Sequence, residues 1–217
     1  MIAFDVAQWW PTLVTVVVLV LYQGLLTIAE RVNPHGVARS SHAHLRAIWF
    51  DAIARRAGTE ILAVQTLRNS LMSATMTAST AALALMGSIS LAAPSFNAMA
   101  ADGITAADLL TPRHLLELVL LLFLFVSLVS SVMAVRYYTH ASFIAGMPAD
   151  ALEKRSWIPI GENYVRKAGL FYSTGLRYFV LIAPVVVGIV HPFAGPIAAI
   201  LVTAVMYSLD QSHPVET

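Results

Sequence analysis

The chain has 217 residues, of which 58% are hydrophobic and 12% are charged, and its formal net charge is +1. Soluble domains carry about 25% charged residues, so this composition excludes an ordinary soluble domain and indicates an integral membrane protein. The absence of cysteine excludes disulfides, thiolate metal sites and thiol nucleophiles. The length predicts a single membrane domain over residues 1–217.

The first apolar segment covers residues 10–28, close to the roughly 20 residues that cross a bilayer. No Lys or Arg precedes it and Glu30 follows closely, so we expect a retained transmembrane helix and not a cleaved signal. The polar stretch 31–60 contains an amphipathic helix, which either lies in the headgroup plane or packs on its own protein. Its predicted apolar face consists of Leu45, Ile48, Trp49, Ala52 and Ile53.

A second span is predicted over residues 64–92, longer than a bilayer needs. Within it, the segment 65–86 carries small residues at four-residue spacing in two adjacent rows, which let helices approach closely in lipid. The rows are Ser70, Ala74, Ala78 and Ala82, and Ser73, Thr77 and Ala81. We therefore expect this helix to be the one around which the others pack.

A third span, residues 115–134, follows a helix start at Thr111 and Pro112. A second polar loop is then expected over residues 136–170. The last apolar block, residues 170–209, is too long for one crossing and is interrupted at residues 191–196, so it predicts spans at 170–190 and 196–209. A helical hairpin or re-entrant limb is favoured over one kinked helix. The fold class is thus all-α, with four to five transmembrane helices and a cytoplasmic-side amphipathic helix.

The positive charges indicate which side faces the cytoplasm. Of the 13 Lys and Arg residues, all but Arg113 lie in or beside the loops 31–60 and 136–170 and the start of the last span. Short basic loops stay in the cytoplasm. The sequence therefore predicts a bacterial inner-membrane protein with a periplasmic N-terminus and with loops 31–60 and 136–170 in the cytoplasm. The C-terminal tail lacks Lys and Arg, so the charge rule does not choose between four and five crossings.

Three short motifs resemble a known family. They are VQTLRNS at 64–70, RYYTHASF at 136–143 and STGLRYF at 173–179. The chain resembles, from about residue 22 to residue 210, the membrane proteins grouped as domain of unknown function 599. Pro184 and the interruption at 191–196 fit that resemblance, which implies a membrane architecture and no catalytic residues.

Eight polar residues form the candidate ligand-binding set, because all lie near the expected cytoplasmic ends of three spans. Ionisable groups at membrane depth are usually paired or functional, and guanidinium groups suit a lipid phosphate, another anion or a partner's carboxylate. Two alternatives are open: the arginines extend to the interface, or the set is a structural polar cluster. The residues are Gln65, Arg68, Asn69, Arg136, Tyr137, His140, Arg177 and Tyr178.

Two histidines, His114 and His191, are expected at the outer surface and are weak candidates for ligating haem b or a metal. No further ligand spacing accompanies them, so no cofactor is predicted. Glu117 lies four residues after Arg113, which indicates an ion pair, with a proton-relay carboxylate as the alternative.

Three function classes follow. The first is a protein without an evident catalytic site that acts as an accessory subunit of a larger membrane complex or self-associates. The second is a channel or small transporter with an arginine-lined cytoplasmic mouth. The third is a haem- or metal-binding redox subunit using His114 and His191. The expected partners are membrane lipids, further copies of the chain or other membrane subunits, and nucleic acid is not expected.

Overall fold

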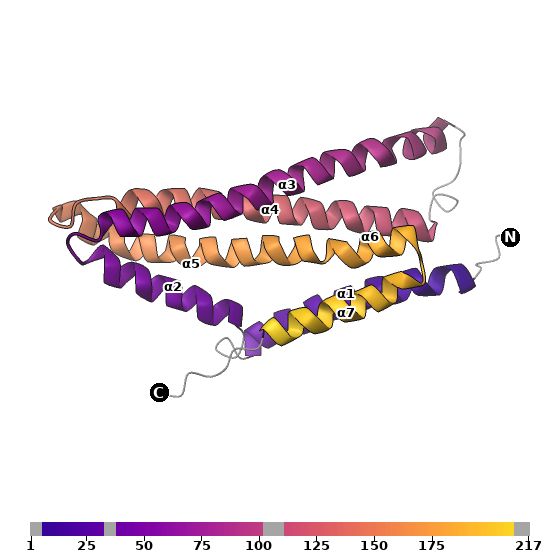
Figure 1. The fold of residues 1–217 in the computed structure, drawn as a ribbon, viewed down its shortest axis with the longest axis horizontal. Coiled ribbons are helices and arrows are strands. Elements are labelled where there is room, and N and C mark those ends of the chain that lie inside the picture. The colour runs from indigo at the N-terminus through magenta and orange to yellow at the C-terminus, as the bar shows by residue number, and fades with distance from the viewer. Residues whose placement is uncertain (1–5, 33–37, 102–110, 211–217) are drawn as a thin grey trace.

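The computed structural model describes residues 6–32, 38–101 and 111–210, and within these ranges it contains seven helices and no strand (Figure 1). Four of the helices are longer than 25 residues, and α5 is followed by two shorter apolar helices. The helices are α1 (Val6–Val32), α2 (Ala38–Ala54), α3 (Glu60–Ala101), α4 (Pro112–Ala145), α5 (Leu152–Val180), α6 (Ile182–Val190) and α7 (Ala194–Asp210).

The chain is an all-α membrane protein. Four segments are long and apolar enough to cross a bilayer, and α7 is a shorter apolar helix. Large apolar side chains cover the outside of α1, where Val20 and Leu25 are 61% and 66% exposed. Such a surface is unfavourable in water and favourable in hydrocarbon. The four long segments are Trp9–Glu30, Glu60–Ala93, Pro112–Ala145 and Leu152–Val190.

The central helix is α4, so the prediction that the second span occupies this position is wrong. α4 packs against α1, α3, α5 and α6. One face of the helix carries small buried residues, and the hydroxyl of Ser127 donates a 2.8 Å hydrogen bond to the carbonyl of Gly175 on α5. The leucine-rich sequence of α4 hides this narrow face, which allows α5 to approach closely.

The helix α3 lies at the side of the bundle, in contact mainly with α4. Its small residues do serve for packing: Ala74, Ala78 and Ala81 are buried. The opposite face has no neighbour among the described residues, and 17% of the most apolar part of α3 is buried, compared with 33% for α4. α3 is therefore half packed and half open.

The amphipathic helix is present as α2, and it packs on α5. Its inward side carries Phe50, which is 1% exposed, while Trp49 and Ile53 from the predicted face pack around it. Leu45 and Ile48 point outward, which shows that the predicted face was centred too far round the helix. Contact with its own protein is thus the alternative that the fold supports.

The region between the third and fourth spans is mostly helical, in contrast to the predicted loop 136–170. α4 continues past residue 134 to Ala145, and α5 begins at Leu152. Lys154, 1% exposed, stabilises the turn between them by donating a 2.6 Å hydrogen bond to the carbonyl of Met147. Pro159 lies inside α5 and does not end it.

The break in the last apolar block is confirmed and forms a hairpin. α6 ends at Val190, and α7 begins at Ala194 and runs back beside α6 and α1 (Figure 1). Gly188 and Gly195 meet at the turn, where a Cβ built on Gly195 would lie 2.9 Å from the Cα of Gly188. Glycine is needed here because the two backbones are in direct contact.

Two hydrophobic cores result, one on each half of α4. The first, named here the α2 core, contains Phe50, Ala54, Ala63, Leu67, Ala74, Ala134, Tyr138, Ala141, Ile144, Ala145, Ile158, Val165 and Ala168. The second, named here the α7 core, contains Leu19, Tyr22, Leu116, Phe123, Leu181, Val185 and Ala199.

Candidate functional site

A network of largely buried charged and polar side chains joins three helices. Arg177 of α5 donates from Nη2 to Oδ1 of Asp210 at the end of α7, over 2.6 Å. The other carboxylate oxygen of Asp210 accepts a 2.7 Å hydrogen bond from the hydroxyl of Tyr22 on α1. The Arg177 and Asp210 side chains are 7% and 17% exposed, so each charge depends on the other.

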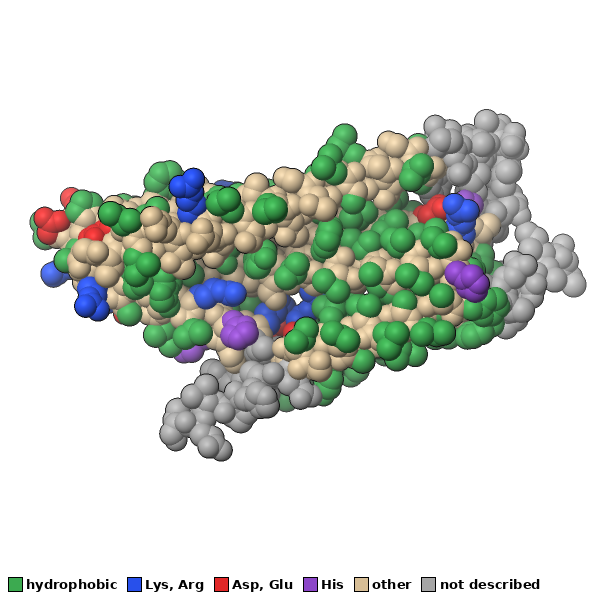
Figure 2. Space-filling view, in the orientation of Figure 1, with side chains coloured by type: hydrophobic (Ala, Val, Ile, Leu, Met, Phe, Trp, Pro, Cys, Tyr) green, Lys and Arg blue, Asp and Glu red, His purple; other side chains and the backbone are tan. Residues whose placement is uncertain are grey.

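This network lies inside the membrane part of the fold. Tyr22 precedes Glu30, the charged end of the first span, by eight residues, which is about 12 Å at 1.5 Å per residue. A charge at such depth is costly unless it is paired and hydrogen-bonded. In Figure 2, basic and acidic side chains gather in a hollow where α7 ends, while the surface along α7 itself is mostly apolar.

A second arginine, Arg39 of α2, contacts α5 one helical turn away from Arg177. Arg39 of α2 donates from Nη1 to both carboxylate oxygens of Glu30, at 2.9 and 3.0 Å. Its Nη2 donates to the hydroxyl of Thr174, three residues before Arg177. Two arginine–carboxylate pairs thus tie α1, α2 and α7 to the same stretch of α5.

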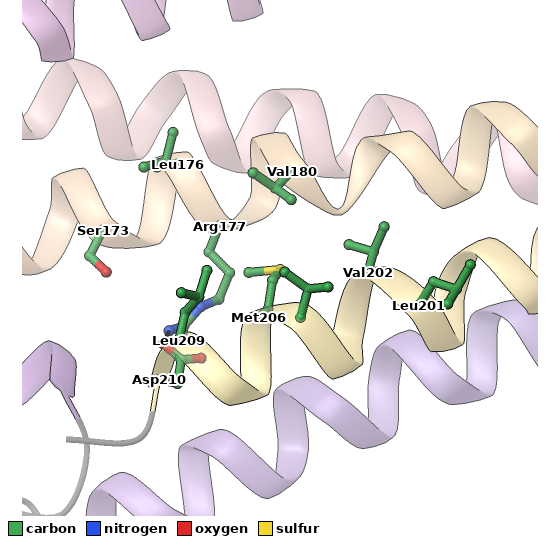
Figure 3. Close-up of a pocket in the computed structure, with 10 residues that line it drawn as sticks. Ser173, Leu176, Arg177, Val180, Leu201, Val202, Met206, Leu209 and Asp210 are labelled. Atoms are coloured by element: carbon green, nitrogen blue, oxygen red, sulfur yellow. Dashed lines mark hydrogen bonds and ion pairs between the residues drawn. The ribbon is translucent and has the colours of Figure 1, made fainter. Parts of the chain in front are cut away.

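Beside the Arg177–Asp210 pair runs a groove of about 440 Å³ between α5 and α7 (Figure 3). Its length is lined by apolar side chains such as Val180, Val202 and Met206. Ser173, Arg177 and Asp210 are the polar residues in the lining, and Figure 3 shows Arg177 reaching across to Asp210. The site is therefore an apolar groove with a charged pair of opposite signs at one end, which suits the binding of an amphiphile.

Among the eight predicted site residues, Tyr137 and His140 belong to an aromatic cluster between α4 and α5. The ring of Tyr137 stacks on Phe171 at 5.7 Å between centroids, and the His140 ring lies 5.7 Å from Tyr164. Lys167 lies over the Tyr137 ring at 5.8 Å. This cluster is continuous with the α2 core and is mainly a packing feature.

The other predicted residues are dispersed. Gln65, Arg68 and Asn69 are exposed on α3, and Arg136 is exposed on α4. Tyr178 packs edge-on against Phe123 at 5.3 Å and lines a separate groove between α1 and α4. The arginine group expected from the sequence therefore separates into residues with different neighbours, and Arg177 alone joins the deep network.

The two histidines have their own neighbours at the opposite end of the bundle. Nδ1 of His114 lies 2.8 Å from the hydroxyl of Thr111, which also caps α4 by accepting from the backbone N–H of residue 114. His191 packs on the ring of Phe193 at the α6–α7 turn. Among the described residues, no group of three or more His, Asp or Glu side chains has a metal-binding arrangement. Glu117 forms the expected ion pair with Arg113, at 2.9 Å.

Sequence reasoning missed four members of the ionic site: Tyr22, Glu30, Arg39 and Asp210. The available signal was Asp210, an isolated acid at the end of the last apolar block, in a span whose predecessor contains the isolated Arg177. A lone acid and a lone base on neighbouring spans are candidates for an ion pair. Tyr22 had no distinguishing signal, because tyrosine near a span end is common.

The fold and this site define the class of protein: an integral membrane protein of packed α-helices with ion pairs joining its spans. Within that class, the chain belongs to the family described as "Protein of unknown function, DUF599", whose model matches residues 11–215. The family suspected from the three sequence motifs is thereby confirmed. Neither the curated proteins nor the solved structures gave a match.

Proposed function

We propose that the protein is a non-catalytic, self-associating membrane protein of the bacterial inner membrane, in which the open face of α3 packs against α3 of a second copy. The observation that carries this proposal is a regular seam along that face. Exposed residues recur at alternating steps of four and three, which is the spacing of a left-handed helix pair. They are Asn69, Ser73, Met76, Thr80, Leu83, Gly87 and Ser90.

The seam alternates small and large side chains. Ser73, Thr80 and Gly87 recur every seven residues, and the larger Met76 and Leu83 lie between them. Small positions admit a close neighbour, and the larger side chains fill the holes between them. A second copy with the same seam is the simplest partner, because two identical alternating surfaces interlock.

The polar residue of the seam supports a parallel arrangement in register. Asn69 lies at one end of the series, and a single Asn within such a seam favours pairing with the equivalent Asn. The hydroxyls of Ser73 and Thr80 donate to the carbonyls four residues earlier, at 3.1 and 2.9 Å, so they leave no unpaired donor in a dry contact.

Cysteine cross-linking tests the seam directly, since the chain has no native cysteine. Oxidation of membranes that contain Ser73→Cys or Thr80→Cys should produce a covalent dimer, because equivalent positions meet across a parallel pair. Leu25→Cys on α1, 66% exposed in the monomer, is the control and should remain monomeric. Equal cross-linking at all three positions, or none at the α3 positions, would contradict the proposal.

A channel is the second candidate, favoured by the same exposed hydroxyls. If Ser73 and Thr80 lined a water-filled path, the two cysteine variants would react with membrane-impermeant maleimides in the unoxidised protein. In a dry seam they remain unlabelled. The two functions therefore predict opposite labelling of the same variants.

The proposed orientation has the N-terminus in the periplasm and the α2–α3 turn in the cytoplasm. It rests on the Lys and Arg distribution, since all but Arg113 lie on or near the α2 side. Impermeant maleimide added to whole cells should label Arg113→Cys and leave Ala57→Cys unlabelled. The reverse pattern would invert the orientation.

A further inference from the structure

The groove between α5 and α7 faces outward along its apolar length. Leu201, Val205 and Leu209 contribute to its wall and are 61%, 58% and 74% exposed. Its volume, about 440 Å³, falls in the range of pockets that hold small organic molecules. In a bilayer, an apolar groove that opens sideways is filled by a hydrocarbon chain.

The polar end of the groove determines which headgroup fits. The Arg177–Asp210 pair carries both signs of charge in one place, 2.6 Å apart. Nη2 of Arg177 is engaged with Asp210, and within the described residues its guanidinium nitrogens show no further hydrogen bond. These donors suit a phosphate oxygen, and the carboxylate of Asp210 has lone pairs left for an ammonium group.

The length of α7 brings headgroups to this depth. Its 17 residues extend about 25 Å, against a hydrocarbon core near 30 Å. A bilayer thins locally beside a short span, so the nearby leaflet surface is drawn toward the end of α7. Asp210 is the last residue of that helix, so local thinning brings the headgroup level closer to the charged pair than it is beside a longer span.

We propose that this groove is a binding site for a phospholipid whose headgroup carries both a phosphate and a primary ammonium. The acyl chain lies along Val180, Val202 and Val205, the phosphate accepts from Arg177, and the ammonium donates to Asp210. A purely anionic headgroup would face the Asp210 carboxylate without compensation. A choline headgroup has no N–H to donate, so it gains less from the same site.

Native mass spectrometry of the purified full chain tests this proposal on the wild type. The protein is exchanged into an equimolar mixture of phosphatidylethanolamine, phosphatidylglycerol and phosphatidylcholine with identical acyl chains. We expect about a tenfold preference for phosphatidylethanolamine, the ratio that one charge-assisted hydrogen bond can supply. The preference should fall when its amine is dimethylated, and fall again with choline. Equal retention of the three lipids, or retention of none, overturns the proposal.

Matched variants on α7 locate the site. Val205→Trp fills the groove and should abolish selective retention, whereas Ile197→Trp, at an exposed position outside the groove, should leave it intact. Asp210→Asn should keep phospholipid binding while shifting the preference toward phosphatidylglycerol, because the carboxylate that repels an anion is gone. If both tryptophan variants behave alike, the lipid is held elsewhere and the proposal fails. The wild-type lipid series decides the matter even if Asp210→Asn does not fold.

Discussion

The two cores on α4 are held together by different physical means. Of the 13 buried residues that form the α2 core, seven are alanine, so its helices lie close and their fit depends on shape. The α7 core has one alanine among seven and is filled by larger apolar side chains. Its outer helices, α1 and α7, are tied to α5 by the Arg177–Asp210–Tyr22 network. Close packing and a buried polar network are thus alternative ways to hold spans together in one small protein.

The largest expected effect lies in the α7 core. Arg177→Met leaves Asp210 as an unpaired carboxylate in a side-chain environment only 17% exposed, and should lower the free energy of unfolding by about 3–5 kcal/mol. Denaturant titration in detergent, followed by circular dichroism, measures this loss. The double variant Arg177→Met/Asp210→Leu should recover most of it. If the double variant is no more stable than the single one, the unpaired carboxylate of Asp210 is not the cause of the loss, and the prediction is contradicted.

The α2 core should respond most to added volume. A Cβ built on Gly161 would overlap the Phe50 ring, so Gly161→Ala must displace that ring from its place between α2 and α5. We expect a loss of about 1–3 kcal/mol in the same titration. Gly24→Ala is the matched control, because nothing lies within 4 Å of its Cβ position and alanine favours the helix. A loss at Gly24 equal to that at Gly161 would show that contact is not the cause.

Two serines one turn apart sharpen the comparison at the α4–α5 contact. Ser127 donates to the Gly175 carbonyl, whereas the equally buried hydroxyl of Ser131 has no partner within the described part of the chain. Ser127→Ala should therefore lower the free energy of unfolding by about 1 kcal/mol, and Ser131→Ala should be neutral or stabilising. Thermal denaturation of both variants in one detergent checks the sign. Equal losses would contradict the assignment.

The smallest effect is expected outside both cores. The Arg113 side chain is 72% exposed in its pair with Glu117. An exposed pair of this kind contributes little, so Arg113→Met should change the free energy of unfolding by no more than about 0.5 kcal/mol. A loss comparable to that of Arg177→Met would mean that burial does not determine how much each ion pair contributes to stability.

Hydropathy was sufficient to predict the spans and the break before α7, because lipid requires long apolar segments and Pro192 and Gly195 interrupt one. It could not identify the central helix. α4 is richer in leucine than α3, and composition does not reveal that Ser130, Ser131 and Ala134 are buried on one side of it. Lipid and protein neighbours both accept apolar residues, so only the fold separates the faces.

The start of α5 was missed for a local reason. Pro159 and Gly161 are residues typical of loops, yet Gly161 lies under the Phe50 ring and Pro159 faces outward on the first turns of the helix. Tertiary packing thus overrides the local signals. Of the ionic site, the sequence predicted only Arg177. Its partner Asp210 lies 33 residues away, and Tyr22, which donates to Asp210, lies 188 residues from Asp210.

The backbone contact between Gly188 and Gly195 has a mechanical consequence. With no side chains between them, α6 and α7 cannot slide or part without losing that contact, so they form one stiff arm. The arm joins α5 at Leu181, and Pro184 supplies no N–H for the carbonyl of Val180, which removes one helical hydrogen bond at that joint. A widening of the space between α5 and α7 that preserves the Gly188–Gly195 contact therefore requires α6 and α7 to rotate together about Leu181.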